Sequence, residues 1–357
     1  MTDLLADIEE LVRCESPSSD HDAVSRSADV VAAIGRRLLN AEPERILVNG
    51  CTHLRWRFGD RPKVLLLGHH DTVWPHGSLE THPFSIVDGV LRGPGCFDMK
   101  TGVVMALHAV AELDDRDGVT ILVTGDEEIG SPSSRSLIED EARDCAAAFV
   151  LEASGPGGAL KTRRKGTSIY RVVVEGKAAH AGLEPEKGIN AGVELAHQVL
   201  AVSALDDPER GTTVVPTVLS AGTTTNTVPA QATVAVDVRA WSKAEQQRVD
   251  QAIRELRPVL AGAQVRIEGG INRPPLENET SADLFRLASE LLPGLTETAV
   301  GGASDGNFTA GVGIPTLDGL GAVGDGAHAD HEHVIVEEIP RRTALLVALL
   351  KSVLATR

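Results

Sequence analysis

The sequence predicts an α/β fold: a mainly parallel sheet with helices on both faces, plus an inserted ferredoxin-like α+β domain. Short apolar runs alternate with helical patterns in the first part of the chain, as in an open parallel sheet. Between about residues 163 and 270 the order becomes βαββαβ, which is that of a ferredoxin-like sandwich. The chain has 357 residues, of which 42% are hydrophobic and only 3% aromatic, and this balance suits layered α/β packing.

The first domain is predicted over residues 1–162 and 271–357. Apolar residues at helical spacing predict helices over residues 3–13, 22–39, 101–113, 134–143 and 339–355. Short apolar runs predict strands buried on both faces over residues 64–67, 119–124 and 147–151. Ligands of such open sheets bind at the carboxyl ends of the strands, so the residues that follow these strands are the first candidates for a site.

The inserted domain is predicted over residues 163–270. Its four strands are expected over residues 168–174, 212–219, 232–239 and 264–268, and its two helices over residues 189–205 and 243–260. This is a complete βαββαβ unit, so we expect it to form a domain within the first one.

The composition argues against several classes of protein. A formal net charge of −17 disfavours binding to nucleic acid and to anionic membranes, and the short basic run Lys161–Lys165 is interpreted as a solvated turn. The four cysteines are far apart, which predicts neither a disulfide scaffold nor a cysteine zinc site. The N-terminus has the pattern of an amphipathic helix and not of a signal peptide, and no apolar run reaches the roughly 20 residues of a membrane span. We therefore expect a cytoplasmic protein.

Acidic residues and histidines gather in four short segments, each expected to follow a buried strand. These segments are residues 68–73, 93–100, 124–130 and 150–152. All four are expected at the carboxyl edge of one sheet, where neighbouring carboxylates imply a cation. Histidine with carboxylate and without cysteine suits a catalytic zinc ion, and cobalt or manganese would also fit.

Two of these segments suggest a division of roles. In the His-x-Asp element, His69 can bind a metal through one ring nitrogen while Asp71 fixes the tautomer through the other. His70 would point to the opposite side of an extended segment and is interpreted as structural. In the pair Glu127-Glu128, one carboxylate can bind metal while the other moves a proton.

Together the segments resemble those of the two-zinc metallopeptidase family that includes aminoacylase, glutamate carboxypeptidase, acetylornithine deacetylase and succinyl-diaminopimelate desuccinylase. The resemblance covers nearly the whole chain in order. It implies two Zn²⁺ ions, with Asp98 bridging them beside a cis peptide bond to Met99, and with Glu127 as the general base. The other ligands that it implies are His69, backed by Asp71, and Glu152 for the first ion, and Glu128 and His328 for the second.

The resemblance also assigns roles outside the metal ligands. His180, in Gly176–Gly182, is similar to a histidine that stabilises the oxyanion, commonly from the partner subunit of a homodimer. Asn226 and Arg239 resemble substrate-binding positions, and Asp305 lies in a glycine-rich loop, residues 301–308, whose backbone amides could hold a carboxylate. Arg273 is either a further anchor or part of a surface ion pair.

The predicted function is metal-dependent hydrolysis of an amide bond in a short peptide or N-acyl amino acid. The amino-acid sequences of the segments are most similar to those of the glutamate carboxypeptidase-like members, and this resemblance implies release of a C-terminal acidic residue. One alternative is an N-acyl-amino-acid deacylase with the same chemistry. Another is a non-catalytic binding protein, which the presence of every ligand and of the base disfavours. A cysteine hydrolase that uses Cys96 lacks a base partner and is disfavoured as well.

Overall fold

The computed structural model describes residues 2–355, which divide into two compact units. Unit 1 comprises Met1–Arg164 and Leu276–Arg357, and unit 2 comprises Lys165–Pro275. The chain leaves and re-enters unit 1 at one backbone pair, because the N–H of Arg164 donates to Leu276 O (3.0 Å) and the N–H of Leu276 donates to Arg164 O (3.1 Å). Unit 2 is therefore an insertion whose ends meet.

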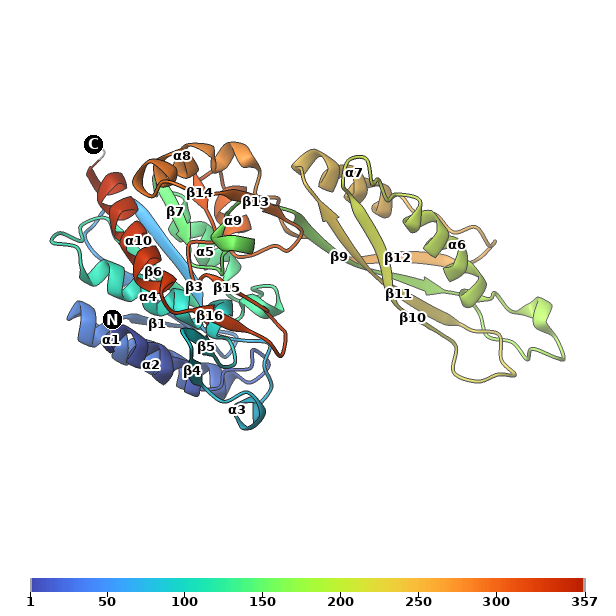
Figure 1. Cartoon of the computed structure of the whole chain (residues 1–357). Helices are drawn as coiled ribbons and strands as arrows, with labels where there is room; N and C mark the ends of the chain where they lie inside the picture. Colours follow the sequence, from blue (N-terminus) through green and yellow to red (C-terminus); the bar gives the residue numbers. More distant parts are fainter. Residues whose placement is uncertain (1, 356–357) are drawn as a thin grey trace. The chain divides into compact units, whose positions relative to one another are not determined.

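A six-stranded sheet forms the centre of unit 1 (Figure 1). In spatial order its strands are β1 (Glu44–Val48), β2 (Cys51–Arg57), β6 (Val119–Thr124), β3 (Val64–His69), β7 (Ala147–Val150) and β14 (Thr316–Leu317). The four strands β6, β3, β7 and β14 run parallel, while β2 is antiparallel to β6 and β1 to β2. The predicted mainly parallel α/β fold is confirmed.

Helices cover both faces of this sheet because β3 is apolar on both sides. Val64 and Leu66 face a core shared with α1, α2, α4, α8 and α10, whereas Leu65 and Leu67 face a second core shared with α5 and α9. The helices of unit 1 are α1 (Thr2–Arg13), α2 (His21–Leu39), α3 (Ser78–Thr81), α4 (Thr101–Ala111), α5 (Arg135–Ala142), α8 (Ala282–Leu291), α9 (Gly306–Gly311) and α10 (Glu338–Ala355). None of the described helices combines the length and the apolarity needed to span a membrane.

Two smaller sheets complete unit 1. One contains β15 (Gly324–Asp325), β16 (His333–Ile335), β5 (Val90–Arg92) and β4 (Ser85–Val87), and the other pairs β8 (Leu160–Arg164) with β13 (Glu297–Val300). These sheets correct two expectations. The segment 93–100 follows β5 and not a strand of the central sheet, and the basic run lies largely in β8 and not in a solvated turn.

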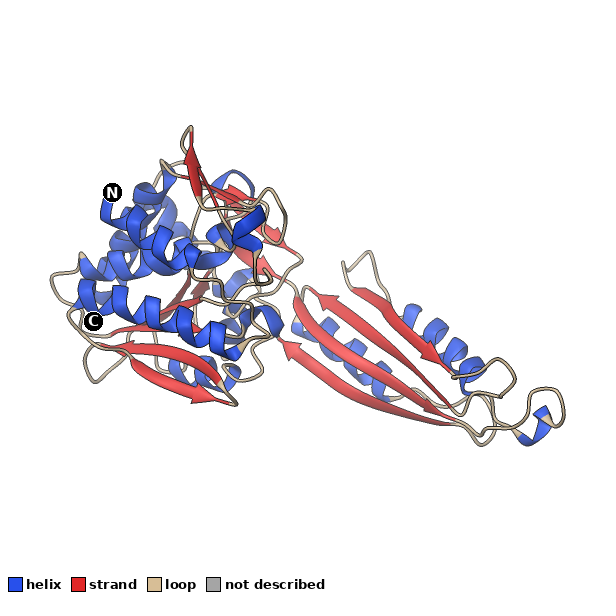
Figure 2. Ribbon diagram, turned by 90° about the horizontal axis from the view of Figure 1, so that it is seen from below, coloured by secondary structure: helices blue, strands red, loops and turns tan. Residues whose placement is uncertain are grey.

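Unit 2 is a four-stranded antiparallel sheet with two helices. Its elements are β9 (Gly166–Glu175), α6 (Ala191–Ser203), β10 (Thr213–Ala221), β11 (Gln231–Ala240), α7 (Lys243–Arg254) and β12 (Gln264–Arg273). The strand order β10-β11-β9-β12 is ferredoxin-like, and both helices pack on one face of the sheet (Figure 2). Side chains cap both helices: Asn190 accepts from the N–H groups of Gly192 and Val193, and Ser242 accepts from Glu245 N–H.

Candidate metal centre

The carboxyl ends of neighbouring parallel strands bring the first predicted ligands together. His69 ends β3 and pairs with Thr124 at the end of β6, while Leu67 of β3 pairs with Val150 of β7. Two residues beyond this last pair, Glu152 is level with His69. Their nearest atoms, His69 Nε2 and Glu152 Oε1, are 3.5 Å apart.

Asp98 lies between two sets of predicted ligands. Its Oδ1 is 3.3 Å from His69 Nε2, and its Oδ2 is 3.3 Å from His328 Nε2. His328 Nε2 in turn is 3.0 Å from Glu128 Oε2. The two oxygens of one carboxylate therefore face different partners: His69 with Glu152 on one side, His328 with Glu128 on the other. The peptide bond Asp98–Met99 is cis, as the resemblance implied.

Several buried polar atoms at this centre lack a hydrogen-bond partner among the residues that the structure describes. They are His69 Nε2, Asp98 Oδ1 and Glu128 Oε1. Buried polar atoms are almost always hydrogen-bonded, so a cluster of exceptions needs another kind of partner. All three are atoms that can coordinate a divalent cation, and His69, Asp98 and Glu128 each offer one ligand atom within 4.8 Å of those of the other two. The residues present fit a metal centre.

The ionisable groups at the centre shift one another's pKa values. Burial raises the pKa of Glu128 to about 7, with a further rise from Asp98 that His328 opposes. The carboxylates of Asp98 and Glu128 raise the pKa of His328 to about 10. Burial alone would lower the pKa of His69, but Asp71, Asp98 and Glu152 raise it well above its usual value. The centre thus concentrates negative charge that a cation would stabilise.

Asp71 connects His69 to the loop that carries the two glutamates. Its Oδ1 is 3.4 Å from His69 Nδ1, whose hydrogen-bond partner is Asp71 O at 3.0 Å. The same carboxylate accepts from the N–H groups of Glu127 and Glu128, both at 3.2 Å, and from Ser18 Oγ at 2.6 Å. Ser18 was not predicted, because it lies more than fifty residues before its partner.

Glu127 lies next to the predicted ligands. It is 8% exposed and stands at the start of a single 3₁₀ turn, Glu127–Ile129. One of its carboxylate oxygens lies within 4.8 Å of ligand atoms of both His69 and Glu152. This placement suits a carboxylate that moves a proton beside the metal ligands.

Arg164 is buried behind Glu152, although the sequence suggested a solvated basic run. It is 3% exposed, and its Nε and one terminal nitrogen donate to Asp318 at 2.8 and 3.1 Å. That terminal nitrogen also donates to Glu152 Oε2 at 3.3 Å, and the other donates to Gly302 O at 3.1 Å. Glu152 therefore presents one oxygen to His69 and the other to a fixed guanidinium.

Asp305 is buried beneath the end of β6. Its Oδ2 accepts from Thr124 Oγ1 at 3.1 Å, and its Oδ1 accepts from Ser131 Oγ. The carboxylate thus ties the glycine-rich loop to the strand that precedes Glu127. Its predicted role in substrate binding stays a prediction.

The predicted site residues of unit 2 fall at opposite ends of its sheet. Arg239 and Arg273 both pair with Thr167 near the start of β9, on the two strands that flank it. His180 and Asn226 lie beyond the other end of β9, where His180 bridges to Thr227 and the N–H of Ala181 donates to Asn226 O. At about 3.3 Å per residue, the eight residues from Thr167 to Glu175 separate the two ends by roughly 26 Å.

Arg239 and His180 have definite hydrogen-bond partners, and Arg273 is buried. Arg239 donates to Asp237 at 2.8 and 2.9 Å, and Arg273 is 7% exposed. His180 Nδ1 accepts from the N–H groups of Gly182 and Leu183, both at 3.1 Å. A neutral His180 ring therefore carries its proton on Nε2, which makes Nε2 a hydrogen-bond donor.

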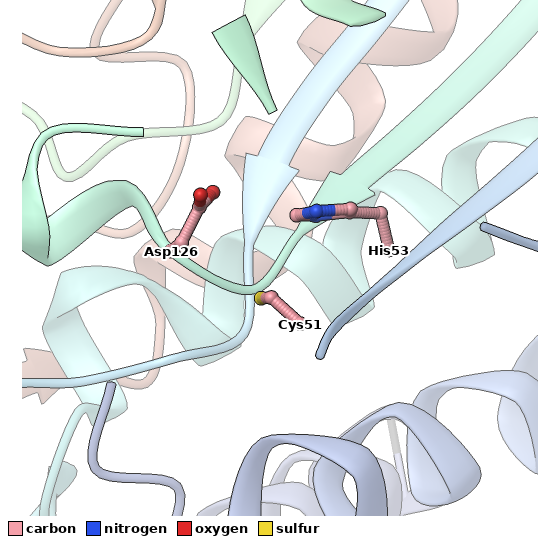
Figure 3. Close-up of side chains that lie close together, drawn as sticks. All are labelled: Cys51, His53 and Asp126. Carbon is pink, nitrogen blue, oxygen red and sulfur yellow. The ribbon is translucent and has the colours of Figure 1, made fainter. Parts of the chain in front are cut away.

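A second cluster of metal-ligand types lies elsewhere in unit 1 and is structural. Cys51 and His53 come from β2 and Asp126 from the loop after β6 (Figure 3). His53 Nδ1 accepts from Gly125 N–H, its Nε2 is 3.0 Å from Ser133 Oγ, and Asp126 accepts four hydrogen bonds from Ser133 and Ser134. Burial raises the pKa of the Cys51 thiol to about 12, which disfavours its thiolate form. These bonds hold the loop that continues into Glu127.

Comparisons with known proteins identify relatives of this chain. The model of the family described as peptidase family M20/M25/M40 matches residues 65–352. Carboxypeptidase G2 of Pseudomonas sp. (strain RS-16) is 28% identical over 96% of this chain and 87% of its own length. Succinyl-diaminopimelate desuccinylase of Methylorubrum extorquens is 29% identical over 96% of both chains. An M20 family metallo-carboxypeptidase from Sulfolobus solfataricus has the same fold, with a TM-score of 0.74 at 16% identity over 99% of both chains.

Proposed function

The chain belongs to peptidase family M20/M25/M40, and we propose that it is a two-zinc hydrolase that cleaves an amide bond to release a C-terminal acidic amino acid. The observation that carries the proposal is the position of Asp98. Its two carboxylate oxygens face two different sets of ligand atoms, with Glu127 close by.

The chain's own residues provide a place for two cations. His69 and Glu152 would hold the first, His328 and Glu128 the second, and Asp98 both. Two bound cations would polarise the scissile carbonyl and lower the pKa of a water molecule. Histidine and carboxylate ligands favour zinc in such a role, and cobalt or manganese would also be accepted.

Glu127 is the group that we assign to proton transfer. It would take the proton of the attacking water and deliver it to the leaving nitrogen, a role that requires a carboxylate outside the ligand set. Asp71 supports this role, because it accepts from the backbone N–H of Glu127 while facing His69. The loop that carries Glu127 is thereby tied to the first ligand.

The distance between the two ends of the unit 2 sheet suggests that its predicted site residues act in two separate groups. A small substrate cannot contact both ends of a sheet that are roughly 26 Å apart. We therefore assign Arg239 and Arg273 to one substrate-binding group, in which two guanidinium groups match the two carboxylates of an acidic amino acid. His180 and Asn226 would then act on the substrate of a second chain in a homodimer, where His180 Nε2–H donates to the developing oxyanion.

Unit 2 has a surface suited to such a dimer. β10 is an edge strand of its sheet, and it exposes Val215, Val218 and Leu219. Leu200, on the neighbouring helix α6, is also exposed. An exposed apolar edge strand offers unpaired backbone groups and apolar side chains to another chain, and a second copy of this chain would cover them.

A second candidate function is deacylation of an N-acyl amino acid. The similarity to succinyl-diaminopimelate desuccinylase, at 29% identity over nearly the whole chain, favours it. The bond that is cleaved and the roles of the residues are the same in both reactions. Only the acyl group and the released amino acid differ.

A substrate panel tests the proposal. Zinc-loaded protein with measured metal content is given peptides ending in glutamate or aspartate, matched peptides ending in leucine, and N-acyl amino acids, and the released amino acid is identified by mass spectrometry. Release mainly from the acidic peptides supports the proposal, and release mainly from N-acyl substrates favours the deacylase. No release from protein with two bound metal ions would favour the non-catalytic alternative. The Glu127→Gln variant is the control, because it should bind metal and release nothing.

A further inference from the structure

We propose that Glu332 is a positioning residue that fixes Asp98 between its two ligand sets, so that its loss weakens cation binding at the centre. The inference rests on the proposed function, because it takes Asp98 and His328 as metal ligands. Glu332 itself is not a ligand. It acts through the segment that carries Asp98.

The Glu332 carboxylate is buried and accepts four hydrogen bonds. It is 4% exposed and precedes β16. Its Oε1 accepts from the N–H groups of Phe97 (2.8 Å) and Asp98 (3.0 Å). Its Oε2 accepts from Gly95 N–H (3.0 Å) and from Trp74 Nε1–H (2.7 Å). Three of the four donors are backbone N–H groups of the segment 95–98, so the carboxylate binds both ends of this segment.

This one side chain connects three parts of the chain that carry predicted ligands. The backbone donors at residues 95–98 include the N–H group of Asp98 itself. Trp74 lies three residues after Asp71, directly beyond the segment 68–73 that carries His69. Glu332 lies four residues after His328. Metal ligands must be held to within about 0.5 Å, and supporting hydrogen bonds of this kind provide that precision.

Replacement of Glu332 by glutamine tests the role of the acceptor atoms. A carboxylate only accepts, whereas an amide has one oxygen and one NH₂ group that only donates. Each carboxylate oxygen faces two N–H donors, so either orientation of the amide places its NH₂ group against two of them. The segment that carries Asp98 must then move, although the side chain keeps its size.

The experiment is a Co²⁺ titration of the full-length, metal-free protein, followed by visible absorption of the bound ion. Glu332→Gln should weaken binding of at least one equivalent by about 10–100-fold and change the absorption spectrum of the bound Co²⁺. Trp74→Phe removes only one of the four donors and leaves those at residues 95–98, so it should have a smaller effect.

Glu194→Gln is the matched control. Glu194 is buried in unit 2 and accepts from the N–H groups of Val259 and Leu260 and from Gln198 Nε2. Its replacement damages a comparable buried network that contains no predicted ligand. It should lower the melting temperature and leave the Co²⁺ affinity and spectrum unchanged.

The outcomes separate the inference from the proposed function. If the wild-type protein binds no Co²⁺, the proposed function is wrong. If the wild type binds Co²⁺ and Glu332→Gln binds it with the same affinity and spectrum, or if Glu194→Gln loses as much affinity, the inference about Glu332 is wrong. If Glu332→Gln does not fold, Glu332→Asp is used instead. It keeps the charge but withdraws both oxygens, and the same loss of affinity is expected.

Discussion

Removal of the Arg164 side chain should destabilise unit 1 far more than removal of an exposed arginine. Arg164→Met keeps the length and apolar stem of the side chain and deletes its guanidinium. The deletion removes two hydrogen bonds to Asp318, one to Glu152 and one to Gly302 O. Asp318 is 0% exposed and Glu152 is 7% exposed, so solvent cannot replace the guanidinium as the partner of either carboxylate.

The magnitude follows from this burial. Removing one partner of a buried ion pair typically costs about 3–5 kcal/mol, because the other charge remains buried. For a domain of this size each kcal/mol lowers the melting temperature by roughly 2–4 °C, so a fall of about 6–20 °C is expected. The control Arg341→Met removes an exposed pair with Glu338 on α10 and should cost less than about 1 kcal/mol.

The assay is urea unfolding of the metal-free protein, with a chelator present so that metal binding does not contribute. Wild type, Arg164→Met, Asp318→Asn and the double variant form a double-mutant cycle. The double variant should be less destabilised than the sum of the two single variants, because Asp318→Asn removes the charge that Arg164→Met leaves unpaired. A cost for Arg164→Met no larger than that for Arg341→Met, or additive effects in the cycle, would refute the reasoning.

Three further predictions concern single side chains. Burial lowers the pKa of His70 to about 4, below the 6.5 of an unfolded chain, so between these pH values the unfolded state binds a proton that the folded state does not. As the pH falls through this window, His70 should therefore reduce the unfolding free energy by up to about 3 kcal/mol. The His70→Gln variant should show a shallower pH dependence of the unfolding free energy in urea. Burial also raises the pKa of the Cys96 thiol well above its usual value, so iodoacetamide at pH 8 should leave the folded protein active; inactivation with alkylated Cys96 would instead support a cysteine hydrolase. His180→Ala should lower kcat by about 10²–10³ with unchanged metal content, whereas a change in KM alone would make His180 a binding residue.

The parts of the fold that the sequence predicted are those with strong local patterns. β3 and β6 are short apolar runs, and both are buried along their whole length. The hairpin of β1 and β2 was missed, because Glu44–Val48 is partly exposed and Cys51–Arg57 mixes polar and apolar residues. β1 is the edge strand of the sheet and β2 lies between β1 and β6; both pair antiparallel, and antiparallel strands need no continuous apolar run.

In the candidate site, too, the residues with local sequence motifs were predicted and those with only long-range contacts were not. Its predicted ligands stand in short motifs, and the structure brings His69, Asp98, Glu128, Glu152 and His328 together. The contacts of the residues that hold them could not be found locally. Arg164 reaches its partner Asp318 across 154 positions, and Glu332 contacts residues more than two hundred positions away. Such contacts depend on the folded chain and leave no spacing signal.

The single backbone pair at which unit 2 joins unit 1 has a consequence for how this chain can vary. Loop-closure entropy depends only on the logarithm of loop length, so doubling the segment between Arg164 and Leu276 would cost the host fold only about 0.6 kcal/mol. The two hydrogen bonds at this junction lie outside the inserted unit, between two residues of unit 1. The inserted unit can therefore be lengthened or shortened with little effect on the sheet that carries the predicted ligands. A unit exchanged for another would have to supply again the roles proposed for His180, Arg239 and Arg273.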